Sequence, residues 1–242
     1  MNRKILIAVI ALIGLSAGAA NAQTSGMCGD SLTWTLTGTA PDLTLTISGT
    51  GDMYNYREST APWFSQRRNI KTLVLHNGMT SIGNYAFITM FGITSATIPN
   101  SVTTIGKNAF SLCFNLTSVI IPNSVTEIGQ AAFHQCRLTS VTIPNSVTAI
   151  GAFAFFNNDL TSLTIPNSVM KIGENAFLLN KNLTDIYVSW TTPPTDIKLM
   201  FDKKICKKNA TLHIPQGTLD VYRNARVWKN FINMVEDVTN TE

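Results

Sequence analysis

Apolar and polar residues alternate over short segments of the chain, and the alternation is clear between Leu138 and Ile143. Leu138, Val141 and Ile143 are apolar, while Ser140 and Thr142 lie between them. Because side chains of a strand point alternately to its two faces, this pattern predicts a short β-strand with one buried face.

A turn and a second buried segment follow this predicted strand. Pro144 cannot donate to a strand ladder, and Asn145 favours a turn. Val147 and Ile150 then return apolar side chains to the core. We expect the next residue, Gly151, to adopt a positive φ, which glycine reaches without a steric penalty.

The pattern repeats along the chain with a step of 22 or 23 residues. One such unit cannot cover its own apolar side, so we expect the units to stack as parallel strands of a β-rich solenoid. Strand-like segments run from Ile70–Leu75 to Leu212–Ile214. The markers are the proline of IPNSV at Pro99, Pro122, Pro144 and Pro166, the glycine of an Ile-Gly pair at Gly83, Gly106, Gly129, Gly151 and Gly173, and the phenylalanine of an Ala-Phe pair at Phe87, Phe110, Phe133, Phe155 and Phe177.

Both ends of the predicted solenoid differ from the repeats and have the patterns of caps. Towards the C-terminus, Thr218 can cap a helix whose Leu219, Tyr222 and Trp228 would pack on the last repeat. Towards the N-terminus, threonines alternate with the apolar residues of an expected β-hairpin, which are Leu32, Trp34, Leu36, Leu43, Leu45 and Ile47. We therefore expect four parts, which are residues 1–22, a β cap over 23–69, the repeats over 70–188, and an irregular last repeat with a helical cap over 189–242.

Residues 1–22 have the pattern of a secretory signal peptide. Two basic residues precede the apolar run Ile5–Leu15, and Ala20-Asn21-Ala22 supplies the small residues of a cleavage site. This run is too short to cross a bilayer, which takes about 20 residues. We expect a secreted or cell-surface protein without a transmembrane segment, and the periplasm stays open as another destination.

The repeat consensus LTSVTIPNSVTxIGxxAFxxC resembles the leucine-rich repeat of the BspA-like bacterial surface proteins, the treponemal type. Residues 28–64 are similar to the segment that commonly precedes such repeats, and residues 212–231 to their usual closing segment. The resemblance implies a β-rich leucine-rich repeat solenoid with an N-terminal β-hairpin cap and a C-terminal helical cap. It also implies a surface-exposed or released protein that engages extracellular proteins, with host adhesion as one role. The interval 189–209 is longer than a normal turn, so the register there stays open.

Composition and charge narrow the possible functions. The 242 residues are 45% hydrophobic and 13% charged, with a formal net charge of +4. These values argue against a disordered chain and against a nucleic-acid binder, which would gather more Lys and Arg on one face. Half of the basic residues after position 22 lie between Lys198 and Lys229. They form either a patch for an anionic partner, such as a sulfated glycan or an acidic protein, or a solvated cap that keeps the stack monomeric.

Residues that carry catalysis or bind metals are sparse. The histidines His76, His134 and His213 lie in different repeats, without the spacing of metal ligands. The one Gly-x-Ser-x-Gly string, residues 14–18, falls inside the expected signal peptide, where no nucleophile elbow can form. We expect no enzymatic activity, no metal and no cofactor.

The four cysteines do not indicate a disulfide framework. Cys113 and Cys136 occupy the same repeat position, and stacking would bring their Cα atoms to about 5 Å, within the range of a disulfide. Equivalent positions point their Cβ atoms in parallel, however, and cysteine is often buried as a thiol. Two buried thiols are therefore favoured over a bridge. Cys28 and Cys206 belong to opposite ends of the solenoid and should not pair.

The outward positions of the predicted strands form one polar face, which repeat proteins use to bind extended partners. Most of this face is a ladder of serines and threonines, with few anchors for tight binding. Asp185, Tyr187 and His213 are the exception and gather near its C-terminal end. The candidate binding residues on the face are Ser118, Ser140, Thr142, Ser162, Thr164, Asp185, Tyr187, Thr211 and His213.

Two functions remain open at this point. The first is a non-enzymatic, monomeric module that binds extracellular or host proteins, with glycans as a further class of partner and no role for nucleic acid. The second is a scaffolding solenoid of the bacterial envelope without a diffusible ligand, on which the outer face merely tolerates polar residues.

Overall fold

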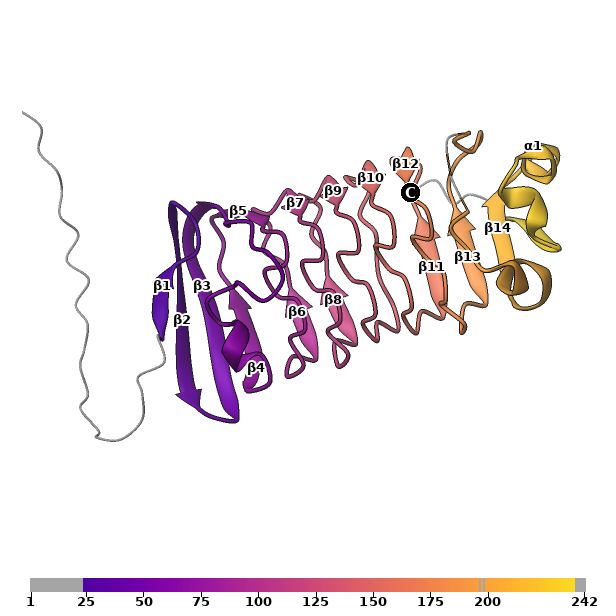
Figure 1. Cartoon of the computed structure of the whole chain (residues 1–242). Coiled ribbons are helices and arrows are strands. Elements are labelled where there is room, and N and C mark those ends of the chain that lie inside the picture. Colours follow the sequence, from indigo (N-terminus) through magenta and orange to yellow (C-terminus); the bar gives the residue numbers. More distant parts are fainter. Residues whose placement is uncertain (1–23, 196, 198, 238–242) are drawn as a thin grey trace, which may run out of the picture.

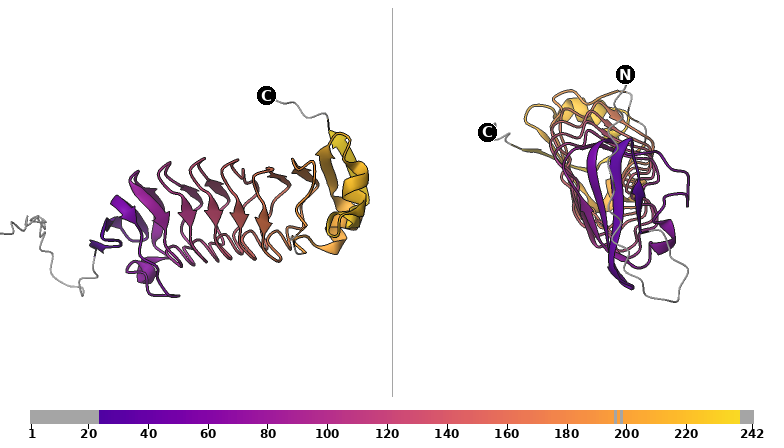
Figure 2. Two further views of the ribbon diagram at one scale, coloured as in Figure 1. Left: turned by 90° about the horizontal axis from the view of Figure 1, so that it is seen from above. Right: turned by 90° about the vertical axis from the view of Figure 1, so that its left-hand side faces the viewer.

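The computed structural model describes residues 24–195, 197 and 199–237, so the expected signal peptide lies outside the described residues. The chain winds into an elongated stack of coils with a β-hairpin at one end and a short helix at the other (Figure 1). Seen along its axis, successive coils lie behind one another (Figure 2). No helix among the described residues is both long and apolar enough to cross a membrane.

The N-terminal cap is the predicted β-hairpin. Strand β2 (Ser31–Thr39) pairs antiparallel with β3 (Asp42–Asp52), and β1 (Ser25–Met27) pairs with the outer edge of β2. The alternating Trp34 and Ile47 are at most 1% exposed. Strand β3 then pairs in parallel with both β4 (Ile70–Leu75) and β5 (Met79–Ile82). This pairing joins the cap to the first coil.

The repeats place their strands in two parallel ladders, which confirms the predicted β-solenoid. The second strand of each coil forms one ladder, made of β5, β7 (Thr104–Ile105), β9 (Glu127–Ile128), β10 (Ala149–Ile150) and β12 (Lys171–Ile172). The first strand of each coil forms the other, made of β6 (Ser95–Thr97), β8 (Ser118–Ile120), β11 (Ser162–Ile165), β13 (Asp185–Val188), β14 (Thr211–Pro215) and β15 (Asn233–Asp237). Between β8 and β11, the single bridge of Thr142 to Thr164 takes the place of a full strand.

The long interval 189–209 does not disturb the ladder. Strand β13 pairs directly with β14, in a register that sets Asp185 beside Thr211 and Tyr187 beside His213. The additional residues form a wider coil that includes a short π-helix, η2 (Ile205–Asn209). The register that the sequence left open is therefore the one that continues the repeats.

A column of stacked phenylalanines fills the centre of the solenoid. Phe110 and Phe133 have ring centroids 5.3 Å apart, and Phe155 and Phe177 have centroids 5.5 Å apart with nearly parallel planes. These rings are at most 1% exposed. The Ala-Phe pair of each repeat thus supplies the apolar core that a single coil cannot build alone.

The expectation of a positive φ at Gly151 was wrong. The left-handed residue is Phe153, two positions later, with a φ of 59°, and Ala131 and Asn175 repeat it with φ values of 54° and 58°. Glycine is needed at position 151 because a Cβ there would lie 2.4 Å from the backbone nitrogen of Gln130 in the preceding coil. Close stacking of backbones, and not local conformation, therefore explains this glycine.

The C-terminal cap contains the predicted helix, α1 (Leu219–Asn224), followed by the 3₁₀ turn η3 (Trp228–Asn230). Tyr222 is buried, and its hydroxyl donates to the carbonyl of Trp190 at 2.8 Å. Thr218 occupies the predicted N-cap position of α1, but its hydroxyl donates to the carbonyl of Pro215 and does not cap the helix. The amide of Leu219 instead donates to the carboxylate of Glu236 at 2.8 Å, which ties α1 to the last strand.

Candidate binding surface

The predicted face exists and consists of two adjacent rows of outward side chains, which we call the serine row and the threonine row. The serine row is Ser95, Ser118, Ser140, Ser162, Asp185 and Thr211, and the threonine row is Thr97, Ile120, Thr142, Thr164, Tyr187 and His213. All nine predicted binding residues lie in these rows. Thr211, Asp185 and His213 are partly buried, and the other six are exposed. Together the rows form the strand face.

The strand face is longer than the sequence predicted. Register pairs carry it across the hairpin, where Thr35 lies beside Thr46 and Thr46 beside Val74. At the other end, β15 continues both rows with Asn233 and Val235. The alternating threonines of the hairpin indicate its outward surface, but their pattern does not show that this surface continues the strand face.

A hydrogen-bonded cluster closes the C-terminal end of the strand face. The Nδ1 atom of His213 lies 2.9 Å from a carboxylate oxygen of Asp237, and its Nε2 atom lies 3.2 Å from Asp185. We call these three residues the Asp-His-Asp cluster, which joins β13, β14 and β15. Asp237 was missed because β15 (Asn233–Asp237) lacks the repeat markers of the other coils.

Tyr187 covers this cluster. Its ring stacks on the imidazole of His213 with centroids 4.2 Å apart, while 38% of the residue stays exposed. The hydroxyl of Thr184 donates to Asp185 at 2.7 Å. That hydrogen bond, followed by the one from His213, lowers the pKa of Asp185 below its ordinary value. The structure therefore brings the predicted Asp185 and Tyr187 each into contact with His213 and favours the charged carboxylate of Asp185 in this cluster.

A second feature of the strand face lies near its N-terminal end. A hollow of about 400 Å³ opens between β4 and β6, where its lining includes Val74, Thr97, Asn100 and Ile120. Ile120 interrupts the threonine row and is 60% exposed. We call this feature the Ile120 hollow. Ile120 is not among the nine residues predicted to bind, although it lies at an outward position of β8.

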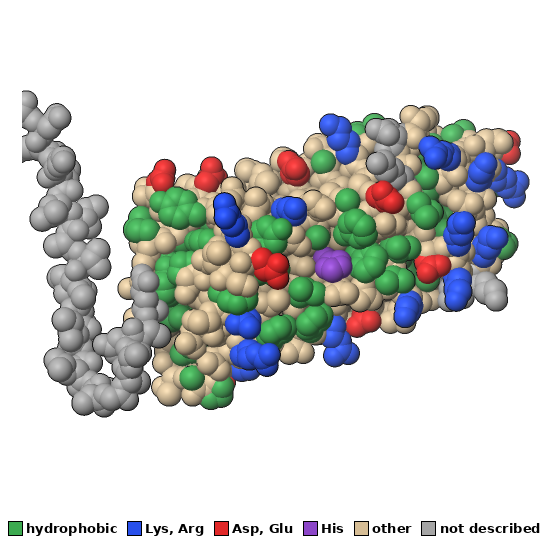
Figure 3. Space-filling view, in the orientation of Figure 1, with side chains coloured by type: hydrophobic (Ala, Val, Ile, Leu, Met, Phe, Trp, Pro, Cys, Tyr) green, Lys and Arg blue, Asp and Glu red, His purple; other side chains and the backbone are tan. Residues whose placement is uncertain are grey.

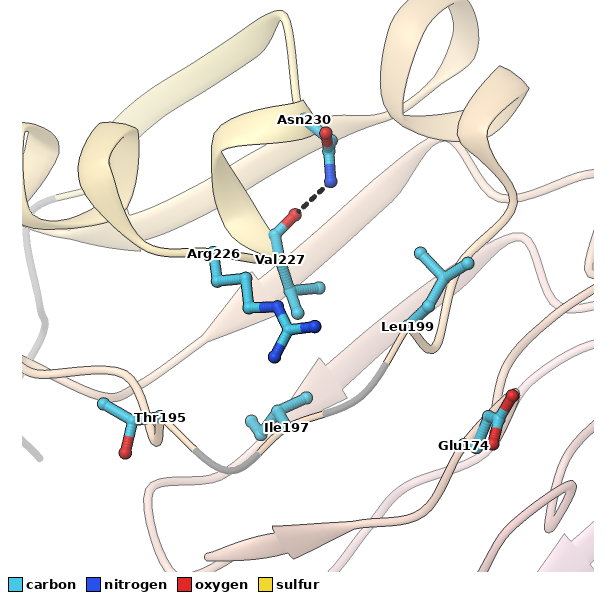
Figure 4. A pocket seen from close by; sticks show the side chains of 7 residues that line it. All are labelled: Glu174, Thr195, Ile197, Leu199, Arg226, Val227 and Asn230. Carbon is cyan, nitrogen blue, oxygen red and sulfur yellow. Dashed lines mark hydrogen bonds between the residues drawn. The ribbon is translucent and has the colours of Figure 1, made fainter.

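Another hollow, of about 500 Å³, is not built from the strand face. It lies between the coil that follows β12 and the C-terminal cap, and its lining includes Glu174, Leu199, Arg226 and Val227. Figure 4 shows the side chain of Arg226 reaching into it, and the amide of Asn230 donating to the carbonyl of Val227. A basic and an acidic side chain thus share the same hollow.

Four buried cysteines and His134 contribute no exposed group to the strand face. Cys113 and Cys136 are buried thiols that donate to the carbonyls of Phe87 and Phe110, both at 3.1 Å. The ring of His134 packs at a tilt against that of Phe156, and burial lowers the pKa of His134. No group of three His, Cys, Asp or Glu that could hold a metal occurs in the part of the chain that the structure describes.

Comparison with known proteins identifies the repeat. Residues 55–116 and 103–216 match the family described as the BspA type leucine rich repeat region, with six copies. A search of curated proteins gave no match. A leucine-rich repeat protein from Bacteroides ovatus ATCC 8483 has a similar structure, with a TM-score of 0.50 and 21% identity over 79% of this chain and 56% of that chain.

Two further solved structures resemble the chain more weakly. The leucine-rich repeat protein of T. pallidum gives a TM-score of 0.47 and 22% identity, over 83% of this chain and 77% of that chain. A leucine-rich repeat protein from Eubacterium ventriosum ATCC 27560 gives a TM-score of 0.38 and 17% identity, over 87% of this chain and 84% of that chain. Because the family match spans residues 55–216, well over half of the sequence, the chain belongs to the BspA-type leucine-rich repeat family.

Proposed function

We propose that this protein is exported through its N-terminal signal peptide and binds extracellular or host proteins through the strand face, with host adhesion as its role. Membership in the BspA-type family suggests a surface protein that takes part in protein interactions. The observation that carries the proposal is the exposed Tyr187, which the Asp-His-Asp cluster holds in place on a face otherwise made of serines and threonines. The protein acts as a monomer in this proposal.

The two ends of the strand face have different parts in this mechanism. Tyr187 serves as the anchor, since exposed aromatic residues dominate the binding free energy of many interfaces. Two carboxylates on one imidazole leave a local excess of negative charge, which favours a partner with Lys or Arg at this point. The apolar Ile120 gives the partner a second contact three coils away. The serines and threonines between them supply hydrogen bonds along an extended partner.

A binding screen tests this proposal. Residues 23–242 would be applied to an array of extracellular-matrix proteins and host glycans, beside a Tyr187→Ala/Thr142→Asp variant. The matched control is Met170→Ala/Thr148→Asp, since these residues are exposed and directly precede β12 and β10, outside the strand face. Circular dichroism and thermal melting verify that all three fold alike. We expect saturable binding to a protein that the first variant loses and the control keeps.

Other outcomes contradict the proposal. An equal loss of binding in the Tyr187→Ala/Thr142→Asp variant and in its control would mean that binding depends on charge alone. Binding that both variants keep would place the site elsewhere. No binding to any protein would favour a scaffolding solenoid. A turnover abolished by Asp185→Asn or His213→Gln would indicate catalysis, although leucine-rich repeat solenoids are typically not enzymes.

A further inference from the structure

The C-terminal cap concentrates exposed positive charge. We call six side chains the basic cap, and all are exposed: Lys203, Lys204, Lys207, Arg223, Arg226 and Lys229. None of them forms an ion pair with another residue in the described part of the chain, where the ion pairs are Arg137 with Asp159 and His213 with its two aspartates. The charge of this end is therefore available to a partner.

Among the described residues 199–237, three of the four acidic side chains accept hydrogen bonds within the protein, and the fourth, Asp220, is exposed on α1. Asp202 accepts from the backbone amide of Lys204 at 2.7 Å, and Glu236 accepts from the amide of Leu219 at 2.8 Å. Asp237 is bound to His213. Four carboxylates face the six cations, so this end of the described chain keeps an excess of positive charge.

The basic residues lie on two segments that pack against each other. The amide of Ile232 donates to the carbonyl of Cys206 at 3.1 Å, which holds the end of the segment with Lys229 against η2. The rings of Phe201 and Phe231 meet edge to face at 5.7 Å beneath them. Blue side chains accordingly gather along this end of the molecule in Figure 3. The fold thus brings lysines from distant parts of the sequence to one end of the solenoid.

We propose that the basic cap binds a sulfated polysaccharide. Four of its six cations are lysines, whose compact charge on a flexible stem suits irregularly spaced anionic groups. The large aromatic residues of the cap, Tyr222, Trp228 and Phe231, are buried. They offer no platform for the base stacking on which binding of single-stranded nucleic acid depends. The cap and the strand face are separate surfaces, so this inference does not rest on the function proposed above.

Affinity for heparin, used as the probe, tests the inference. The variant Lys203→Gln/Lys204→Gln/Lys207→Gln would be compared with Lys107→Gln/Lys171→Gln/Lys181→Gln, which removes the same charge from exposed positions on the repeats. We expect the cap variant to bind heparin about tenfold more weakly, because three exposed ion pairs can together contribute the corresponding binding free energy. The control variant and Tyr187→Ala should bind heparin like the parent.

Three results would overturn the inference. Equal losses in the cap variant and the control would show that net charge alone attracts heparin. Binding that the cap variant retains would place the site elsewhere. Stronger competition by polyglutamate than by heparin, at equal charge, would assign the basic cap to an acidic protein segment.

Discussion

The imidazole of His213 lies almost face to face with the ring of Tyr187, at a centroid distance of 4.2 Å and an interplanar angle of 20°. The two residues are direct neighbours in the ladder of β13 and β14. Asp185 and Asp237 hold the imidazole from both sides. The exposed tyrosine is therefore oriented before a partner arrives, and a preorganised anchor loses less conformational entropy on binding.

The Asp-His-Asp cluster should also stabilise the C-terminal edge of the solenoid. In His213→Gln, one amide group replaces the imidazole that contacts both carboxylates and stacks on Tyr187, so we expect the free energy of unfolding to fall by about 1–2 kcal/mol. Amide hydrogen exchange in β15 should become faster, while β6 and β8 stay protected, because repeats contact only their neighbours. His76→Gln, at an exposed position, is the matched control. Unchanged exchange in β15 would show that the cluster does not hold this strand.

The lowered pKa of Asp185 predicts a specific response to acid. The hydroxyl of Thr184 and then His213 favour the carboxylate in the folded state, so the pKa lies below its ordinary value of 3.8. The resulting stability is present above the ordinary pKa and is lost as the pH falls through the lowered one. Thermal melting of the parent and of Asp185→Asn at pH 5, 4, 3 and 2 measures this effect. We expect the difference between their melting temperatures to shrink towards pH 2, and a constant difference would contradict the assignment.

The repeat spacing was sufficient to predict the strand face. Parallel stacking sets residues one repeat apart side by side, so Ser162 meets Asp185. The register from Tyr187 to His213 stayed open in the sequence, because the interval 189–209 is longer than a normal turn, and the pairing of β13 with β14 sets it. Asp237 could not be placed in this way, because β15 lacks the IPNSV and Ile-Gly markers that define the other coils. Its position depends on how the C-terminal cap folds back.

The extension of the face through the hairpin was unpredictable for a different reason. Alternation shows that Thr35 and Thr46 point outward, but not which strand lies next to them. That contact depends on the parallel pairing of β3 with β4, in which the register shifts between Leu43 and Thr44. Local sequence patterns do not specify such a shift.

Glycine at position 151 gives a test of the close stacking between coils. A methyl group there would meet the backbone of Gln130, which cannot turn away as a side chain can. We expect Gly151→Ala to lower the free energy of unfolding by about 3 kcal/mol, as overpacking does. Ala131→Gly is the control, since it changes a residue at a φ of 54° without adding volume. Its effect should stay within about 0.5 kcal/mol, and a tolerated Gly151→Ala would contradict this explanation.

The cysteines should be unreactive in the folded protein. Burial raises the pKa of Cys28 to about 12 and that of Cys206 to about 11, and it also raises the pKa of Cys113. Little thiolate then exists at pH 8.5, and the thiolate is the reactive form. Mass spectrometry after treatment with iodoacetamide should find no label on the native chain and four labels in denaturant. Two labels in denaturant without a reductant would reveal a bridge.

A substitution of Ile120 can test binding by the strand face without changing the stability of the protein. It is 60% exposed, so Ile120→Thr removes little buried surface and completes the threonine row; the free energy of unfolding should change by less than about 0.5 kcal/mol. If a partner occupies the Ile120 hollow, its affinity should fall about fivefold, because the lost apolar contact is worth about 1 kcal/mol. Met170→Thr, at a residue that is 55% exposed outside the face, is the control. An affinity unchanged by Ile120→Thr but lost in Tyr187→Ala would confine the footprint to the C-terminal half of the strand face.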